Sequence, residues 1–326
     1  MIAKKILNWY DNNKRLLPWR NKFSKKKKEY CTIVSEFMLQ QTKVTTVIPY
    51  FNSFLKNFPN IESLSKTTET NLLKYWQGLG YYSRAKNLKK SANIIVKEYK
   101  SRLPNNFDEL KKLPGIGDYT ASAILAIVFN KPVIPLDGNI ERVLKRILNL
   151  KSESQTTKKN LHKFKKVFGK TNRSSDYVQA LMEIGALLCK PKNPHCEKCP
   201  ITKNCVSYKN KDFELRTKKK KNIDKFYAVT LYRNNDKILL IKNEKFKFLK
   251  NLLIIPMKEI SKSDFLLKYT NKLNLRMSNM NMNISVDLLK TKNKPKNGLW
   301  VKKENLGSHM IPTFTRKIFS FAKNTL

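Results

Sequence analysis

The chain has 326 residues, enough for two domains or for one large domain with an appendage. Hydrophobic residues make up 40% of it, which is ample for a packed core, and no apolar run is long enough for a membrane-spanning helix. The first residues also lack a signal-peptide pattern. The 67 Lys and Arg against 24 Asp and Glu give a formal charge of +43, which attracts polyanions such as nucleic acid. Because the excess is mostly lysine, a bias in amino-acid composition across the whole proteome is an alternative explanation for the positive charge.

Residues 1–210 show helical periodicity and no strand pattern. Apolar residues keep helical spacing over Val44–Leu55, Ala85–Tyr99 and Ile140–Leu148. The lysine run Lys25–Lys28 is interpreted as a solvated loop. Glu36 lies in the apolar helical stretch Thr32–Leu39, where burial of a carboxylate is costly and raises its pKa. It is therefore a candidate general acid, with a surface-facing or paired structural role as the alternative.

The segment Leu113-Pro-Gly-Ile-Gly-Asp-Tyr-Thr-Ala121 precedes an apolar helix predicted over Ser122–Phe129. Gly115 and Gly117 allow a tight hairpin whose amide groups bind a phosphate at the start of that helix. A simple helix connection is the competing interpretation. Farther along, Asp137 directly precedes the amphipathic helix that starts at Ile140, where a helix N-cap is the simplest role.

Four of the five cysteines fall within 17 residues, in the pattern Cys189-x6-Cys196-x2-Cys199-x5-Cys205. This clustering indicates metal binding in a reducing compartment rather than a disulfide framework. Four thiolates suit zinc or a [4Fe–4S] cluster, and the single CxxC pair favours the cluster because zinc ribbons usually have two. The lone Cys31 is expected to lie in the core.

Beyond a lysine-rich linker at 218–225 the periodicity changes to that of a small α+β domain over 226–326. The expected strands and helices follow from alternating and helical apolar spacing. We predict strands over Phe226–Arg233, Lys237–Lys242, Leu252–Met257, Ile284–Leu289 and Gly298–Lys302, and helices over Leu266–Leu273 and Ile318–Phe321.

Taken together, the cysteine pattern, the hairpin Leu113–Gly117 and Asp137 resemble the endonuclease III superfamily of DNA glycosylases. Ser35–Thr42 (SEFMLQQT) and Gln77–Arg84 (QGLGYYSR) are similar to motifs of its adenine DNA glycosylase (MutY) branch. The resemblance is close over residues 1–210 and weaker over the rest. It implies an all-α helix–hairpin–helix domain over 1–217, with a six-helix part at about 30–134 and an iron–sulfur part from 1–29 and 135–210.

The resemblance also implies roles for individual residues. Glu36 matches the acid that protonates adenine, Asp137 the carboxylate that stabilises the sugar cation, and Asn139 a residue that orients this site. Tyr119 stands where bifunctional relatives have a Schiff-base lysine, which implies a monofunctional enzyme that leaves an abasic site. Its phenol is expected to support Asp137.

Further matches concern DNA contacts. Gln41 and Tyr81 match residues that wedge into the duplex when adenine flips out. Trp19, Arg20 and Glu183 match residues of the adenine pocket. The C-terminal domain resembles a MutT-like (Nudix-like) module that reads 8-oxoguanine but lacks a hydrolase signature, and Ser278 in Met277-Ser278-Asn279 aligns with its base-contacting serine.

The resemblance implies a monomer in the bacterial cytoplasm, associated with the nucleoid, that carries a [4Fe–4S] cluster and acts on double-stranded DNA with adenine opposite 8-oxoguanine or guanine. Two other readings stay open. One is a bifunctional glycosylase for oxidised pyrimidines, opposed by Tyr119 and by the C-terminal domain. The other is a non-catalytic DNA-binding protein, opposed by Glu36 and Asp137.

Overall fold

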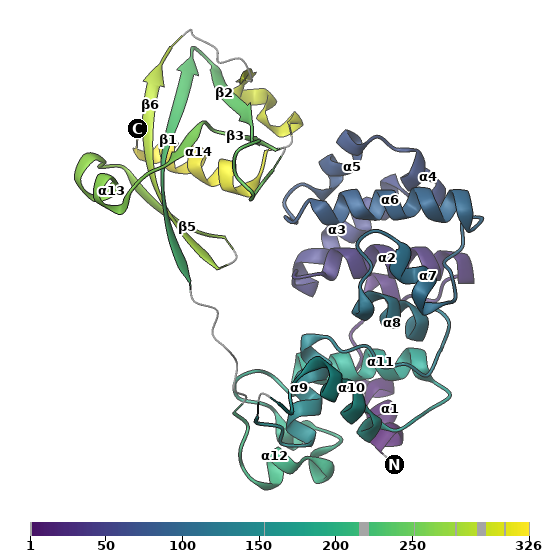
Figure 1. Ribbon diagram of the computed structural model, residues 1–326. Coiled ribbons are helices and arrows are strands. Elements are labelled where there is room, and N and C mark those ends of the chain that lie inside the picture. The colour runs from purple at the N-terminus through teal and green to yellow at the C-terminus, as the bar shows by residue number, and fades with distance from the viewer. Residues whose placement is uncertain are drawn as a thin grey trace. The chain divides into compact units, whose positions relative to one another are not determined.

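The computed structural model describes residues 2–152, 154–214, 222–250, 252–277, 279–291, 298–309 and 311–325 (Figure 1). Contacts divide the chain into two compact units. The first, the helical unit, comprises Met1–Thr67 and Ser83–Thr217, and the second, the sheet unit, comprises Thr68–Tyr82 and Lys218–Leu326. A bilayer-crossing helix would need a longer apolar stretch than any helix in the described ranges offers.

The helical unit is built from helices and short turns, as the periodicity of residues 1–210 predicts. Its α-helices are α1 Ile2–Asn13, α2 Lys25–Leu39, α3 Val44–Asn57, α4 Ile61–Lys66, α6 Ser83–Glu98, α7 Phe107–Lys112, α8 Asp118–Ile127, α9 Gly138–Ile147, α10 Lys158–Phe164, α11 Ser174–Glu183 and α12 Val206–Lys209. Short 3-10 turns cover Pro18–Arg20, Lys165–Phe168, Cys196–Lys198 and Thr202–Asn204, and a π-helical turn, Ile184–Leu188, continues α11.

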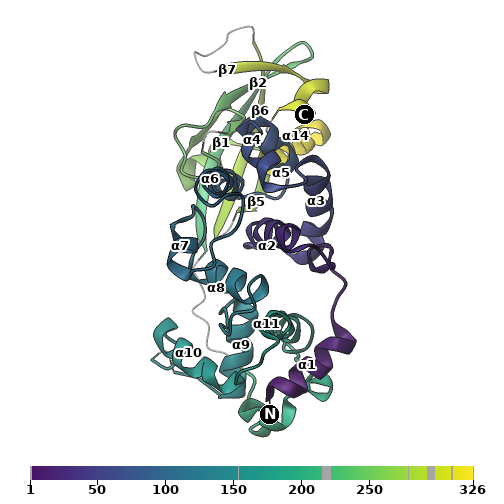
Figure 2. The ribbon, with the colours of Figure 1, turned by 90° about the vertical axis from the view of Figure 1, so that its right-hand side faces the viewer.

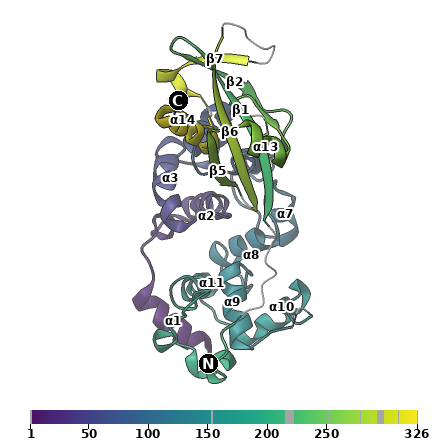
Figure 3. The same ribbon diagram turned by 90° about the vertical axis from the view of Figure 1, so that its left-hand side faces the viewer.

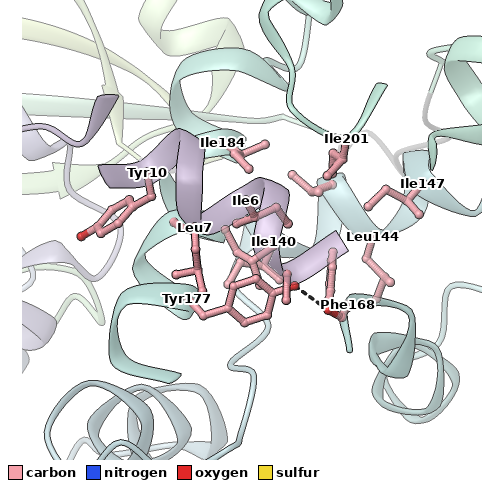
Figure 4. Close-up of a cluster of buried hydrophobic side chains, with 14 of the residues drawn as sticks. Ile6, Leu7, Tyr10, Ile140, Leu144, Ile147, Phe168, Tyr177, Ile184 and Ile201 are labelled. Carbon is pink, nitrogen blue, oxygen red and sulfur yellow. Dashed lines mark hydrogen bonds between the residues drawn. The ribbon is translucent and has the colours of Figure 1, made fainter. Parts of the chain in front are cut away.

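One core of this unit joins the N-terminus to the segment that follows Asp137. The apolar stripe of α9 packs against α1 and α11 in a cluster that includes Ile6, Ile140 and Leu144 (Figure 4). The Tyr177 hydroxyl donates a hydrogen bond of 2.5 Å to the Phe168 carbonyl within it. Helix α1 lies beside α11 (Figure 2). The start of α9, where Asp137 lies, is therefore anchored by a buried helix face.

The prediction of a solvated loop at Lys25–Lys28 is wrong, because these lysines form the first turn of α2. Ser24 caps the helix by accepting a hydrogen bond from the Lys27 amide. The lysine side chains reach outward to partners: Lys26 pairs with Glu62 at 2.6 Å, and Lys27 donates to the Pro59 carbonyl at 2.6 Å. A lysine run is compatible with a helix when one face is solvated and a cap starts it.

The sheet unit contains helix α5, Glu69–Trp76, and seven strands in its described part. The strands are β1 Ile223–Asn234, β2 Lys237–Lys242, β3 Leu253–Ile254, β4 Met257–Glu259, β5 Lys272–Met277, β6 Met280–Lys290 and β7 Gly298–Lys302. The order is β3-β2-β1-β6-β5, with β4 paired to β1 and β7 to β2. β1 and β6 run parallel, and the other pairs are antiparallel.

A helix packs on each face of this sheet (Figure 3). Phe226 of β1 contacts Phe265 of α13 (Lys262–Lys268), with ring centroids 5.3 Å apart. The next residue, Tyr227, belongs to the core that contains Phe314 of α14 (Thr313–Thr325). Because successive strand residues point to opposite faces, the two helices cover different sides. α5 joins this unit through Gln77, whose Nε2 donates to the carbonyls of His309 and Ile311 at 3.0 and 3.1 Å.

The structure confirms most of the predicted strands and corrects two elements. The predicted helix over Leu266–Leu273 is wrong in its second half: α13 ends at Lys268, and β5 begins at Lys272 with alternating exposure. The helix was predicted from apolar spacing that included Leu266 and Leu267, but both side chains are largely exposed and do not belong to the core. The predicted strand Leu252–Met257 is divided between β3 and β4. Cys31 is fully buried, as expected.

Candidate active site

A cavity of about 770 Å³ lies in the helical unit, and residues distant in sequence line it together. Its walls come from α2, from the turn that follows α2, and from the beginnings of α8 and α9. Further lining comes from the Pro18–Arg20 turn and from α11. Of the residues singled out in the sequence, the lining includes Trp19, Arg20, Glu36, Gln41, Tyr119, Asp137, Asn139 and Glu183.

Glu36 reaches this cavity from the last turn of α2 and is only 6% exposed. Burial raises the pKa of its carboxyl from 4.5 to about 7, and the nearby negative charge of Asp137 adds to the increase. A hydrogen bond from Tyr119 and the charge of Arg20 act in the opposite direction. The expectation of a buried carboxylate with a raised pKa is confirmed, so Glu36 can hold a proton near neutral pH.

Tyr119 occupies the first turn of α8, directly after the hairpin. Its phenol is hydrogen-bonded to Glu36 and is also affected by the charge of Asp137, and the expected support of Asp137 stays a prediction. Burial, followed by the charges of Glu36 and Asp137, raises the pKa of this phenol well above 10. The phenol therefore stays neutral and acts as a hydrogen-bond donor.

Asp137 is the N-cap of α9, as the sequence suggested, and its catalytic role stays a prediction. It caps α9, since its Oδ1 accepts a 2.7 Å hydrogen bond from the Ile140 amide, and it also faces the cavity. Its Oδ2 accepts a 3.0 Å bond from Asn139 Nδ2. Burial raises the pKa of Asp137, while these hydrogen bonds lower it. The cap fixes the carboxylate at the positive end of a helix, where a negative charge is favoured.

Two residues that the sequence did not reveal fix Asn139. Arg142 Nη2 donates to Asn139 Oδ1 at 2.8 Å and to the Gly185 carbonyl at 2.7 Å, and its Nε donates to the Cys189 carbonyl at 2.6 Å. Gly185 lies so close that an added Cβ would be 2.5 Å from Asn139 Cβ. Arg142 follows Asn139 by three residues on α9, a spacing that could have indicated the contact. No sequence signal marked Gly185.

Glu183 is fully buried and forms a charged cluster with two arginines. Arg15 contacts it through two nitrogens at 2.7 and 2.8 Å, and Arg20 Nη1 donates at 2.8 Å. Burial acts to raise the pKa of Glu183, but the two guanidinium groups outweigh it and lower that pKa. Glu183 therefore stays ionised and holds Arg20 in the cavity wall, beside Trp19. Arg15 was not among the predicted site residues, because no sequence motif marks it.

The two hairpin glycines have different structural reasons. Gly115 has a φ of +85°, and an added Cβ would lie 2.7 Å from Phe37 Cε1. A side chain there is excluded both by backbone strain and by close packing. Gly117 is the N-cap residue of α8, and no atom lies within 4 Å of an added Cβ. Its open side leaves the helix start accessible to an anion.

The two proposed wedge residues occupy strained turns in different units. Gln41 has a φ of 55° and lines the cavity of the helical unit. Tyr81, in the sheet unit, has a φ of 47° and a side chain 48% exposed, and it follows Gly78 and Gly80, which also have positive φ. Non-glycine residues adopt this conformation rarely, and such strain concentrates at functional sites. Ser278 lies outside the described residues.

The four cysteines of the pattern line one pocket, together with Arg146 and His195. Burial raises the pKa of the Cys199 thiol to about 11, and the charges of Cys189 and Cys205 contribute to that rise. Among the described residues, no three Cys, His, Asp or Glu side chains are grouped as the ligands of a single ion. Four thiols that line one pocket are the donor set that a [4Fe–4S] cluster requires.

Comparisons with known proteins identify the family of this chain. Residues 34–170 match the HhH-GPD superfamily of base excision DNA repair proteins. The chain is 39% identical over 284 residues to the adenine DNA glycosylase of Buchnera aphidicola subsp. Baizongia pistaciae, covering 85% of this chain and 79% of that protein. The enzyme of the same name from Buchnera aphidicola subsp. Schizaphis graminum is 39% identical over 265 residues, covering 78% of this chain and 74% of that protein.

Solved structures support the fold of the helical unit. A thermostable thymine-DNA glycosylase gives a TM-score of 0.57 at 26% identity, covering 64% of this chain and 95% of that chain. A trapped endonuclease III–DNA covalent intermediate gives a TM-score of 0.53 at 20% identity, with the same coverage, and shows the fold alone. On the sequence similarity over most of both chains, this protein belongs to the adenine DNA glycosylase family of base excision DNA repair enzymes.

Proposed function

We propose that this enzyme removes adenine mispaired with 8-oxoguanine or guanine from double-stranded DNA, without cutting the strand. One observation carries the proposal: Glu36, whose pKa is raised, and Asp137 face the same cavity. Tyr119 lines this cavity as well and is hydrogen-bonded to Glu36. Adenine enters the cavity after flipping out of the duplex, which exposes its glycosidic bond to both carboxyl groups. Gln41 and Tyr81 fill the gap that the base leaves.

The two carboxyl groups have opposite tasks in this mechanism. Protonated Glu36 donates its proton to the adenine ring, which makes the base a better leaving group. As the bond to the sugar breaks, positive charge develops on the sugar, and ionised Asp137 stabilises it. We further propose that Asp137 forms a transient covalent link to the sugar before water replaces it with retention. Asn139 and Arg142 keep the Asp137 carboxylate in place.

Tyr119 supports the monofunctional part of the proposal. A strand-cutting glycosylase needs an amine that forms a Schiff base with the sugar, and a neutral phenol cannot replace it. Burial keeps the pKa of Tyr119 well above 10 and thus the phenol protonated. Adenine is released, and its sugar stays in the strand as an abasic site that is not cleaved further.

The remaining parts of the proposal concern the cofactor and the sheet unit. Cys189, Cys196, Cys199 and Cys205 would hold a [4Fe–4S] cluster, which would neutralise the thiolates and stabilise the loop around them. Lys190, Lys192, Lys198 and Lys203 on that loop would contact DNA phosphates. The sheet unit would act as the MutT-like reader of 8-oxoguanine, and the whole enzyme as a monomer in the bacterial nucleoid.

The proposal is tested with a duplex that carries adenine opposite 8-oxoguanine, and in parallel opposite guanine. Strand breaks are compared with and without alkali, and borohydride is added to trap a Schiff base. Breaks that appear only after alkali, with no trapped adduct, are the expected result. Breaks without alkali together with an adduct would instead identify a bifunctional glycosylase. No base release by a cluster-loaded preparation would indicate a non-catalytic DNA-binding protein.

The pKa shifts predict how the rate of adenine release depends on pH. Glu36 must be protonated, and its pKa of about 7 predicts that the single-turnover rate falls as the pH rises through about 7. Asp137 must be ionised, so the rate also falls on the acid side, at a pH above the ordinary Asp range because burial raises its pKa. Single-turnover excision between about pH 5 and 9 measures both limbs. A rate that is constant or rises through pH 7 would contradict the assignment.

A further inference from the structure

Arg84, the second residue of α6, is buried, with only 6% of its surface exposed. Its Nη1 donates to three carbonyl oxygens, those of Phe37 at 3.0 Å, Met38 at 2.7 Å and Gln40 at 2.6 Å. These carbonyls belong to the last turn and the C-cap of α2, where helical carbonyls lack partners within the helix. A cation at this end also balances the negative pole of the helix. Arg84 is thus a side-chain cap of α2.

The capped end leads directly into the turn that forms the rim of the cavity. Gln40, Gln41 and Thr42 all line the cavity. Gln41 has a φ of 55°, which costs conformational free energy and persists only where neighbouring contacts enforce it. Three hydrogen bonds provide those contacts. The Thr42 amide donates to the Leu39 carbonyl at 3.1 Å, the Thr42 hydroxyl donates to the Gln40 carbonyl at 3.3 Å, and Arg84 donates to the same Gln40 carbonyl.

Arg84 itself is not among the residues that line the cavity, so its influence on bound DNA would be indirect. It holds the Gln40 carbonyl, which immediately precedes the strained residue. We propose that Arg84 is a positioning residue that holds Gln41 in the conformation needed to insert into DNA beside the flipped adenine. This inference rests on the proposed function, because it requires Gln41 to fill the gap in the duplex.

Arginine suits this position better than lysine. The planar guanidinium is rigid and sets the directions of its N–H groups, so Nη1, which donates to all three carbonyls, is held in a fixed orientation. Lysine keeps the positive charge and much of the length but has a compact ammonium that cannot hold the same geometry. Arg84→Lys is therefore expected to fold and to keep a weaker cap on α2, while the turn at Gln41 loses its fixed conformation.

A matched control is available near the other end of α2, where a second arginine contacts the helix. Arg102 Nε and Nη2 donate to Glu29 of α2, with the Nε bonds 3.0 and 3.1 Å long, and neither residue lines the cavity. Arg102→Lys weakens a contact that stabilises α2 but leaves the turn after Leu39 unchanged. A purely structural role of Arg84 predicts the same behaviour for both variants.

The experiment compares Arg84→Lys, Gln41→Ala, their combination and Arg102→Lys in the full chain. Affinity is measured for a duplex with a cleavage-resistant 2′-fluoro-adenosine opposite guanine, and 2-aminopurine fluorescence in a parallel duplex reports base flipping. Arg84→Lys is expected to weaken binding about tenfold and to reduce the flipping signal. Adding Gln41→Ala to it should weaken binding by less than about a further twofold, because both changes disable one element. Arg102→Lys should lower only the melting temperature.

The possible failures are distinguishable. Effects of Arg84→Lys and Gln41→Ala that multiply in the double variant would overturn the positioning role and leave the proposed function intact. An equal loss of binding in Arg102→Lys would also overturn it, because it would show that α2 stability alone is responsible. No effect of Gln41→Ala by itself would overturn the wedge role assigned to Gln41 in the proposed function, and this inference with it.

Discussion

Glu36→Gln is expected to lower the single-turnover rate of adenine release by about a thousandfold while DNA binding is retained. The amide has the shape of the carboxyl group and can still accept the hydrogen bond from Tyr119, but it cannot donate the proton that adenine needs in order to leave. Burial disfavours a charged carboxylate at this position, so a neutral amide should not lower the free energy of unfolding. Single-turnover excision, DNA-binding anisotropy and thermal unfolding measure the three quantities.

Glu29→Gln is the matched control, because Glu29 lies on the same helix and is likewise buried, at 3% exposure. Glu29 accepts hydrogen bonds from Arg102 and from the Leu103 amide, the latter at 3.0 Å, and it lies outside the cavity. This variant should lose about 1–3 kcal/mol of unfolding free energy and keep its rate per folded molecule. Full activity of Glu36→Gln, or an equal loss of rate in both variants, would refute the general-acid assignment.

Asp137→Asn is expected to lower the rate of adenine release by a factor on the order of a hundred to a thousand. The amide oxygen can still accept the bond that the Ile140 amide now donates at 2.7 Å, so the cap of α9 and the fold are retained. The negative charge that stabilises the sugar cation is lost. Because the charge of Asp137 also raises the pKa of Glu36, the alkaline limb of the remaining activity should move to lower pH.

Asn106→Ala is the control for Asp137→Asn, because it removes the N-cap of a helix away from the cavity. Asn106 caps α7 by accepting from the amides of Asp108 and Glu109 at 2.9 and 3.2 Å, and it does not line the cavity. Its loss should cost about 1 kcal/mol of stability with no change in rate. If Asp137→Asn kept the wild-type rate, or if its alkaline limb did not move, the charge of Asp137 would have no part in the reaction.

Local patterns in the sequence were sufficient for several parts of this site. The apolar helix around Glu36 predicted a buried carboxyl group with a raised pKa, and the structure confirms both. The glycine spacing in Leu113–Gly117 predicted a tight turn before a helix, and Asp137 before an amphipathic stretch predicted an N-cap. Each of these features depends on neighbours within a few residues, so helix periodicity and turn preferences encode it.

Local patterns failed where tertiary contacts decide the conformation. Leu266 and Leu267 suggested a longer helix, but the alternating residues from Lys272 onward pair with β6 as strand β5. A short apolar run does not distinguish these outcomes, because the pairing partner lies elsewhere in the chain. The lysines of Lys25–Lys28 likewise form a helical turn because Pro59 and Glu62 are nearby to receive them.

The sequence by itself thus determined the helical and mixed parts of the chain, the hairpin and the burial of Glu36, and it singled out the four cysteines and the two carboxyl groups as candidates. Only the tertiary structure decided how these groups are held: Tyr119 hydrogen-bonded to Glu36, Arg15 paired with Glu183, and Arg142 and Gly185 fixing Asn139. Such contacts join residues up to 168 positions apart, as for Arg15 and Glu183, and no local period records them. The pKa of Glu36 depends on this same convergence, because the charge of Asp137 acts on it only in the folded chain.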